Sequence, residues 1–325
     1  MRVLGAVLGI VLAAGACAAS AATSARSPGE ITFTAAKTSP KRDAIYGVRS
    51  DGSGLRTILR DAARPAWSPD GKRFAYYGGA GCRGFCVADA NGRNRRLLFG
   101  ADCGSGSDVA WSRDGTRLAL ACAPGARIVV VRADGTRARR VRSVTGTGFP
   151  QIGGLAWSPD GRTIAYYTTR LQKGKLRGAI EIVKPDGSKT MRLSTVRNLS
   201  AVSARASWTR DGTTLAFQLD PDFVGLFDFG RRVVANVVGG SSPAFSPDGT
   251  KLAFEQDGDI FVAAAGKPKA AQVVKGGAAP VWSPDSRALA FVAQGGRVGV
   301  VNADGSGGRF VTGRYVDLLD VAWRR

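Results

Sequence analysis

The sequence predicts an all-β fold in which seven small four-stranded sheets form a closed ring, a seven-bladed β-propeller. Three observations predict it. A phrase built around an aromatic residue and an Asp-Gly turn recurs along the 325 residues at intervals of about forty, the length of one propeller blade. Short apolar segments separated by further Asp-Gly or Asn-Gly turns fill each interval. Segments at the two ends of the chain supply the strands of one last blade.

The recurring phrase is Trp-Ser-Pro-Asp-Gly or a close variant. Six complete copies and one truncated copy begin at Trp67, Trp111, Trp157, Trp208, Phe245, Trp282 and Trp323. Ser, Pro and Gly in this order favour a type I turn, and the Asp side chain accepts hydrogen bonds from nearby backbone N–H groups. We therefore expect the aromatic residue on the innermost strand, packed between blades. The repeated Asp residues are expected to be structural rather than catalytic or metal-binding.

The strand count gives the number of blades. Each complete copy is followed by three more apolar segments, so six blades begin at the six complete copies. Three segments near the N-terminus, Ile31–Thr34, Ala44–Val48 and Leu55–Leu59, lack an inner strand, and the segment ending at Trp323 lacks three partners. Pairing the two sets completes a seventh blade and leaves no free sheet edge. A six-bladed ring is the alternative, but it leaves three or four well-formed strands unpaired.

These units resemble the Ser-Pro-Asp-Gly, WD-repeat-like propeller repeats of the TolB-like proteins. The resemblance covers the chain from about Ile31 to its end, and it rests on the repeated Trp-Ser-Pro-Asp-Gly and Ala-Asp-Gly phrases. It implies the propeller fold, but it leaves the function open because such propellers serve many roles. TolB itself has six blades and a separate α/β domain before them, which we do not expect here.

The first 25 residues have the layout of a secretory signal peptide, and residues 30–325 form the predicted propeller. Arg2 is followed by the apolar stretch Val3–Gly15 and then by a tract of small residues. An uncleaved membrane anchor is one alternative. Ala14–Cys17 also resembles a bacterial lipobox, so a lipid anchor on Cys17 is another, although Ala14 departs from the usual Leu, Val or Ile. All versions predict an exported protein that is periplasmic, envelope-associated or secreted.

Cysteine usage agrees with export. The other four cysteines, Cys82, Cys86, Cys103 and Cys122, lie in one short stretch of the chain. In an oxidising compartment an even number of cysteines indicates disulfides. We prefer the pairs Cys82–Cys86 and Cys103–Cys122, at the loops of one propeller face, although the sequence does not fix the pairing. A zinc site built from all four thiolates is the alternative, but the paired spacing of zinc knuckles is missing.

Composition removes several kinds of chemistry. The chain has no His, which excludes Ser-His-Asp and Cys-His nucleophile systems and His-ligated catalytic zinc sites. Lys and Arg total 46 against 25 Asp and Glu, a formal net charge of +21. Such an excess favours acidic or anionic partners.

Basic loops supply the predicted binding residues. In a propeller, the loops between the second and third strands and the links between blades share one face, where long variable loops bind ligands. The basic residues of two such loops are Lys37, Lys41, Arg42, Arg170, Lys173, Lys175 and Arg177. We expect them to bind an anionic envelope component or an acidic envelope protein, and we do not expect nucleic acid as the partner. Solvated charge is the alternative, as for Arg139, Arg140 and Arg142 on an outer strand.

Two acidic loops on the same face are the candidate cation site. Their carboxylates are Asp220, Asp222, Glu255, Asp257 and Asp259, and oxygen ligands of this kind suit Ca²⁺. Asp257-Gly258 is equally typical of a plain hairpin turn. No other cofactor is predicted.

The sequence therefore predicts an exported, monomeric, non-catalytic propeller that acts as a protein-interaction or polyanion-binding module. An enzyme on the same fold, a lyase or hydrolase using carboxylates or a bound cation, is the alternative.

Overall fold

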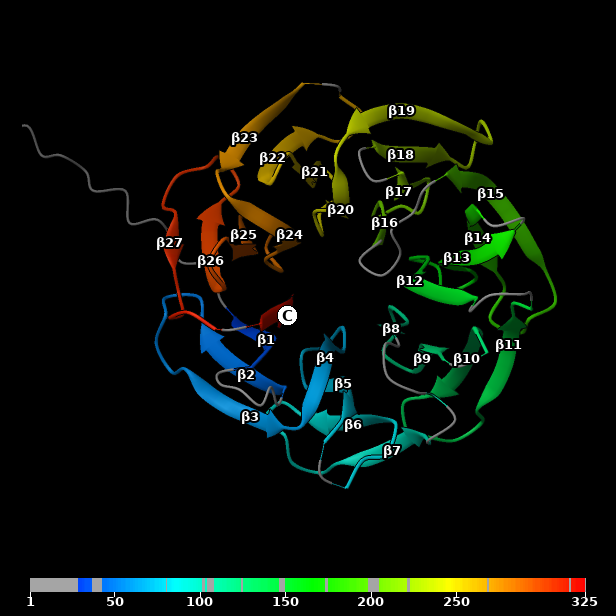
Figure 1. The fold of residues 1–325 in the computed structure, drawn as a ribbon, viewed down its shortest axis with the longest axis horizontal. Coiled ribbons are helices and arrows are strands. Elements are labelled where there is room, and N and C mark those ends of the chain that lie inside the picture. The colour runs from blue at the N-terminus through cyan, green and yellow to red at the C-terminus, as the bar shows by residue number, and fades with distance from the viewer. Residues whose placement is uncertain are drawn as a thin grey trace, which may run out of the picture.

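The computed structural model describes residues 29–36, 43–79, 81–100, 103, 108–123, 125–145, 150–172, 175–197, 205–220, 223–267, 269–315 and 317–324. They form 28 strands in seven antiparallel four-stranded sheets arranged as a ring (Figure 1), and the ring encloses a central channel. No helix in this described part of the chain is long and apolar enough to cross a membrane. The predicted signal peptide and Cys17 lie outside the described residues.

The blades are numbered in chain order, and their strands are given from the channel outward. Blade 1 consists of β28 (Asp317–Trp323), β1 (Glu30–Ala36), β2 (Ala44–Arg49) and β3 (Arg56–Arg60). Blade 2 consists of β4 (Ala62–Trp67), β5 (Arg73–Gly78), β6 (Phe85–Asp89) and β7 (Arg96–Phe99). Blade 3 consists of β8 (Val109–Trp111), β9 (Arg117–Cys122), β10 (Arg127–Arg132) and β11 (Arg139–Ser143). Blade 4 consists of β12 (Gln151–Trp157), β13 (Ile164–Gln172), β14 (Lys175–Val183) and β15 (Thr190–Arg197).

The remaining three blades follow the same plan. Blade 5 consists of β16 (Ala206–Trp208), β17 (Thr214–Asp220), β18 (Phe223–Asp228) and β19 (Val233–Gly239). Blade 6 consists of β20 (Ser241–Phe245), β21 (Lys251–Gln256), β22 (Asp259–Ala264) and β23 (Ala270–Val274). Blade 7 consists of β24 (Gly277–Trp282), β25 (Ala288–Ala293), β26 (Arg297–Asn302) and β27 (Arg309–Phe310).

The ring closes where the two ends of the chain pair in blade 1. Strand β28 lies antiparallel to β1, with Ile31 opposite Trp323 and Phe33 opposite Val321. In Figure 1 the C-terminus accordingly lies at the centre of the ring, beside β1. This pairing confirms the seven-bladed ring and excludes the six-bladed alternative.

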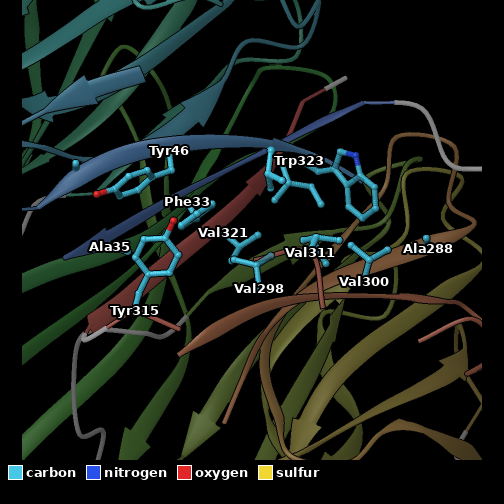
Figure 2. Packing of buried hydrophobic residues seen from close by; sticks show 14 residues of the cluster. Phe33, Ala35, Tyr46, Ala288, Val298, Val300, Val311, Tyr315, Val321 and Trp323 are labelled. Atoms are coloured by element: carbon cyan, nitrogen blue, oxygen red, sulfur yellow. The ribbon is translucent and has the colours of Figure 1, made fainter. Parts of the chain in front are cut away.

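A hydrophobic cluster fills the junction between blade 1 and blade 7 (Figure 2). Phe33 stacks on Tyr46 with 5.3 Å between ring centroids, and Tyr315 packs edge-on against Phe33 at 5.2 Å. Val298 and Val300 of β26 belong to the same cluster from blade 7, and Figure 2 shows Val300 beside Trp323. Full burial of one such side chain contributes roughly 1.5–3 kcal/mol, so this cluster holds the two ends of the chain together.

The second strand of each blade explains how closely the blades pack. In this strand, the residue that pairs with the residue before the inner-strand aromatic residue is a fully buried Ala in six blades, and these residues are Ala75, Ala119, Ala165, Ala216, Ala253 and Ala290. The equivalent residue of blade 1 is Thr32, which is also fully buried. A small residue here lets the strand pass close to the neighbouring sheet, with large apolar side chains on either side.

The tryptophans of the inner strands bond to the preceding blade. Trp111 donates its indole N–H to the carbonyl of Ala66 at 2.8 Å, and Trp157 donates to Ala110 at 3.1 Å. Trp208 and Trp282 make the same bond to Ala156 and Ala244. Each acceptor is the residue before the aromatic residue of the preceding blade, so the repeated phrase ties each of these blades to its neighbour.

The Ser-Pro-Asp-Gly phrase forms the expected turn. In blade 2, Ser68 Oγ donates to Asp70 Oδ1 at 2.6 Å, and Asp70 Oδ1 also accepts from the backbone N–H of Lys72 at 3.1 Å. The Gly71 N–H donates to the Ser68 carbonyl at 2.9 Å, which closes the turn. The same pattern recurs in the other complete copies. The structural role predicted for these Asp residues is confirmed.

Both preferred disulfides are present. Cys82 bonds to Cys86, and Cys103 bonds to Cys122, across sequence separations of 4 and 19 residues. The prediction that all four lie in loops is wrong for two of them, because Cys86 belongs to β6 and Cys122 ends β9. The second bridge fastens the link between blades 2 and 3 to β9.

Candidate functional site

Strand alternation gives the ring two different faces. The Ser-Pro-Asp-Gly turns and the second Asp-Gly turns of each blade lie on one face, called here the turn face. The loops between second and third strands and the links between blades lie on the other, called here the loop face. Between the two faces runs a central channel of about 1210 Å³. Ligand pockets commonly enclose roughly 300–1,000 Å³, so the channel is large enough to admit a small molecule.

The loop-face mouth of the channel is a ring formed by one residue from each blade. In every copy this is the residue three positions before the aromatic residue, and all seven line the channel: Arg64, Asp108, Gly154, Arg205, Ser242, Ala279 and Asp320. We call these residues the mouth ring. Gly, Ala and Ser fill the position in three blades, so the fold does not require a charged residue there. The four charges are therefore candidates for a binding role.

A backbone bulge places the mouth-ring residues. The inner strands of blades 2, 4, 6 and 7 each shift register at this point. Arg64, Gly154, Ser242 and Ala279 adopt positive φ values of 61°, 61°, 50° and 51°. Such a bulge bends the strand and re-aims one side chain. Positive φ strains an Arg but not a Gly, so Arg64 is held in an unfavourable conformation at the mouth.

The two acids of the mouth ring differ in their surroundings. Asp108 accepts hydrogen bonds from the backbone N–H groups of Val109 and Leu155, both at 2.8 Å, and so links blades 3 and 4. Asp320 accepts a bond from the Thr34 N–H at 3.2 Å, within its own blade. Burial raises the pKa of the Asp320 carboxyl, while the nearby charges of Arg205 and Arg64 oppose the rise. Among the described residues, neither arginine forms a direct ion pair with a carboxylate.

A long hairpin of blade 4 carries the basic residues predicted from the sequence. Strands β13 and β14 have nine residues each, whereas the second and third strands of the other blades have five to seven. In this hairpin Arg170 stands opposite Arg177, and Arg177 stands opposite Arg197 of β15. We call these three positions the arginine row. Like charges directly opposite each other destabilise a sheet, so the facing pair Arg170 and Arg177 is costly to the fold.

The other predicted basic residues are only partly described. Lys175 stands opposite Gln172 at the end of the hairpin, and Lys173 lies outside the described residues. Lys37, Lys41 and Arg42 also lie outside them. The structure thus brings Arg170 and Arg177 together, and it leaves the link to the N-terminal loop a prediction.

The acidic residues proposed for Ca²⁺ are engaged with the backbone and with neighbouring side chains. Glu255 accepts a bond from the Ala279 N–H at 3.3 Å, and Asp259 accepts one from the Gly276 N–H at 2.8 Å and one from Gln272. Asp257 is a turn residue with φ of 53°. Asp222 and the side chain of Asp220 lie outside the described residues. Within the described part of the chain, no three His, Cys, Asp or Glu side chains lie close enough together to hold a metal ion.

Sequence reasoning missed the mouth ring. Its members belong to five residue types with no shared chemistry, so no motif marks them. Counting three residues back from each aromatic residue is the signal that finds them.

No protein family matches the sequence, and no curated protein matches it either. The fold is similar to that of two solved structures. TolB from Acinetobacter baumannii matches with a TM-score of 0.58 and 17% identity, over 91% of this chain and 66% of the TolB chain. A chain of a nidogen–laminin complex matches with a TM-score of 0.53 and 15% identity, over 74% of this chain and 92% of that one. These likenesses confirm the TolB-like propeller fold predicted from the repeats.

Proposed function

We propose that this protein is an exported, non-catalytic binding module that holds an acidic protein on its loop face. The observation that carries the proposal is the arginine row of blade 4, in which Arg177 stands opposite Arg170 of β13 and, on its other side, in register with position Arg197 of β15. Opposite charges at these positions would stabilise the sheet, whereas like charges weaken it. A residue pattern that costs stability is explained when a partner supplies the compensating charges.

Exposed apolar side chains elsewhere on the loop face favour a protein as the partner. Leu171 of the same hairpin is 43% exposed, and Leu319 in the inner strand of blade 1 is 56% exposed. A face that offers both guanidinium groups and exposed apolar side chains suits a partner that offers carboxylates and apolar contacts. The similarity to a propeller from a nidogen–laminin complex supports the same choice. The alternative partners are an anionic envelope polymer and a lipid surface, and the experiment below distinguishes them from an acidic protein.

The mouth ring extends this surface to the centre of the face. Arg64 and Arg205 line the mouth without a direct ion pair to any described carboxylate. A partner that covers both the arginine row and the channel mouth would contact arginines of both. The bridges Cys82–Cys86 and Cys103–Cys122 stiffen neighbouring parts of this face.

An enzyme on the same fold is the second candidate, and Asp320 is the observation that favours it. A carboxyl whose pKa is raised inside a cavity has a property of a general acid. Glycoside hydrolysis requires a second, available carboxylate, and Asp108 is instead occupied by two backbone N–H groups. Turnover of a glycan or peptide substrate that is lost in Asp320→Asn would establish this candidate in place of the first.

Affinity capture with charge-reversed variants tests the proposal. The purified protein and the double variant R170E/R177E are each incubated with envelope extract, and the retained proteins are quantified at low and high salt. We expect one acidic protein to be retained by the wild type, released by salt and lost by the variant. The matched control R139E/R140E makes the same charge change on β11, on exposed side chains, and should retain the partner. The conservative variant R170K/R177K should keep part of the binding.

Two outcomes would overturn the proposal. Retention of the same partner by R170E/R177E would show that the arginine row takes no part. Binding of the wild type to vesicles of anionic phospholipid, without retention of any protein, would show that the partner is a membrane surface. Equal losses in R170E/R177E and R139E/R140E would show general charge attraction rather than a site.

A further inference from the structure

The turn-face end of the channel carries a second pair of arginines. The second turn position, two residues after the aromatic residue, is Pro69, Pro159, Pro247 and Pro284 in four of the six complete copies. In the other two copies it is Arg113 and Arg210. All six residues line the channel. Two arginines thus take the place of proline around one opening.

The two arginines meet across the end of the channel. Arg113 Nη1 donates to the backbone carbonyl of Arg210 at 3.4 Å. They belong to blades 3 and 5, which are separated by blade 4, so the Arg113 side chain spans the opening to reach its partner. The contact fixes one guanidinium group beside the residue that carries the other.

The nearby acids are already engaged within their own turns. Asp114 Oδ1 accepts from Ser112 Oγ at 2.5 Å and from the Thr116 N–H at 3.0 Å. Asp211 Oδ1 accepts from Thr209 Oγ1 at 2.7 Å and from the Thr213 N–H at 3.0 Å. Among the described residues, no carboxylate forms a direct ion pair with Arg113 or Arg210. Both arginines therefore lie at this end of the channel without a direct counter-charge among the described residues.

The fold gives no reason for arginine at these two positions. Proline presets φ for this position of a type I turn, and the four sister turns use it. Arginine gives up that advantage and places two like charges together. From this substitution and from the contact between the Arg113 side chain and the Arg210 backbone carbonyl, we propose that Arg113 and Arg210 form a binding site for an oxyanion at the turn-face end of the channel.

The chemistry of the site defines its ligand class. Planar guanidinium groups bind the oxygens of phosphate and carboxylate with pairs of hydrogen bonds. The proline rings around the same opening are apolar, so they leave the two arginines as the charged groups of this opening among the described lining residues. Because the channel volume is about 1210 Å³, a small phosphorylated compound or organic acid has room to extend inward between the tryptophans.

The test measures binding of two small probes to the free protein. Inorganic phosphate and succinate are titrated separately into the full-length protein by calorimetry, at constant ionic strength set with chloride. The variants Arg113→Pro and Arg210→Pro introduce the residue of the sister turns, so both are expected to fold. We expect each variant to weaken binding by about tenfold or more, the effect of losing a charge-assisted hydrogen bond. Preference for one probe identifies the ligand as phosphate-bearing or carboxylate-bearing.

A matched control separates a site from general charge. Arg162 is exposed on the turn face but does not line the channel, and three of its sister positions hold Thr116, Thr213 and Thr250. Arg162→Thr should bind as the wild type does. Absence of binding by the wild type, unchanged binding by both proline variants, or an equal loss in Arg162→Thr would overturn the proposal. Because R170E/R177E leaves this end of the channel intact, it should bind the probes normally whether or not the loop-face proposal holds.

Discussion

Trp67 donates its indole N–H to the hydroxyl of Thr32 at 2.9 Å, and Thr32 in turn donates to the carbonyl of Ala322 at 3.4 Å. In blades 3, 4, 5 and 7 the equivalent tryptophan donates to the backbone carbonyl directly. Among the described residues this relay occurs only between blades 1 and 2, and Thr32 occupies the position that is Ala in the other six blades. A hydroxyl group therefore completes the contact between blade 2 and the closing blade.

Replacing Thr32 tests this relay. Thr32→Val keeps the shape but removes the acceptor and leaves a buried indole N–H unpaired, at a cost of about 1–3 kcal/mol. Thr32→Ser retains the hydroxyl and should lose much less. Thr32→Ala restores the residue of the sister blades and gives Trp67 room to reach Ala322 directly. Urea unfolding of the three variants measures the difference, and equal losses for Val and Ser would show that the hydroxyl is unimportant.

Removing the disulfides should affect stability unequally. In the chain-entropy description, the bridge Cys103–Cys122 contributes about 3 kcal/mol and the shorter Cys82–Cys86 about 2 kcal/mol, since their separations are 19 and 4 residues. We expect C103A/C122A to lower the free energy of unfolding more than C82A/C86A does. Denaturant unfolding with and without a reducing agent measures this, because reduction should abolish the differences. A larger loss for the shorter loop would contradict the prediction.

The raised pKa of Asp320 predicts a pH-dependent gain from its amide variant. As the pH rises above the ordinary carboxyl value of about 3.9, the unfolded chain releases this proton before the folded protein does. The wild type therefore loses stability from that value up through the raised pKa of Asp320. Asp320→Asn keeps an acceptor for the Thr34 N–H and does not ionise. The free energy of unfolding of this variant, relative to that of the wild type, should rise from about pH 4, the ordinary carboxyl pKa, toward about pH 7. If the two proteins show the same dependence of unfolding free energy on pH, the raised pKa of Asp320 is contradicted.

The turn aspartates predict the opposite dependence. The hydrogen bond from Ser68 lowers the pKa of Asp70, and the bond from Thr209 likewise lowers that of Asp211. A lowered pKa contributes stability above the ordinary carboxyl value, and that contribution is lost as the pH falls through the lowered value. Asp70→Asn should cost roughly 0.5–1 kcal/mol at neutral pH, a figure reduced for exposure. Denaturant unfolding at neutral and acidic pH should show that the stability lost in Asp70→Asn disappears in acid. A loss of stability that persists in acid would contradict the stabilising role of the ionised carboxylate.

The architecture could be predicted because each repeat is recognised from short sequence patterns. The turn phrase, the alternating strands and the complementary terminal strands are short-range patterns, and they fixed the number of blades and the position of the closing pair Ile31 and Trp323. The cysteines were paired correctly because the partners are near each other in the sequence and were expected on the same propeller face. Long-range register is different. Arg197 lies twenty residues from Arg177, and only the strand pairing of β14 and β15 places them opposite each other.

Arg142 is a second case in which the sequence did not predict a long-range contact. We expected it to be solvated charge on an outer strand. It bonds instead to the buried Glu181 at 3.0 Å and to the Tyr166 hydroxyl at 3.0 Å, across the junction between blades 3 and 4. Glu181 is isolated in the sequence from its basic partners, so nothing local marks it. Ion pairs between blades depend on how two sheets pack, which the period of a repeat does not encode.

The bulged inner strand has an evolutionary consequence. One backbone shape accepts Arg, Gly, Ser or Ala at the channel mouth in blades 2, 4, 6 and 7, so a single residue change there can alter what the protein binds while the scaffold keeps its form. Four such places make this fold easy to redirect toward new molecules without first rebuilding its architecture.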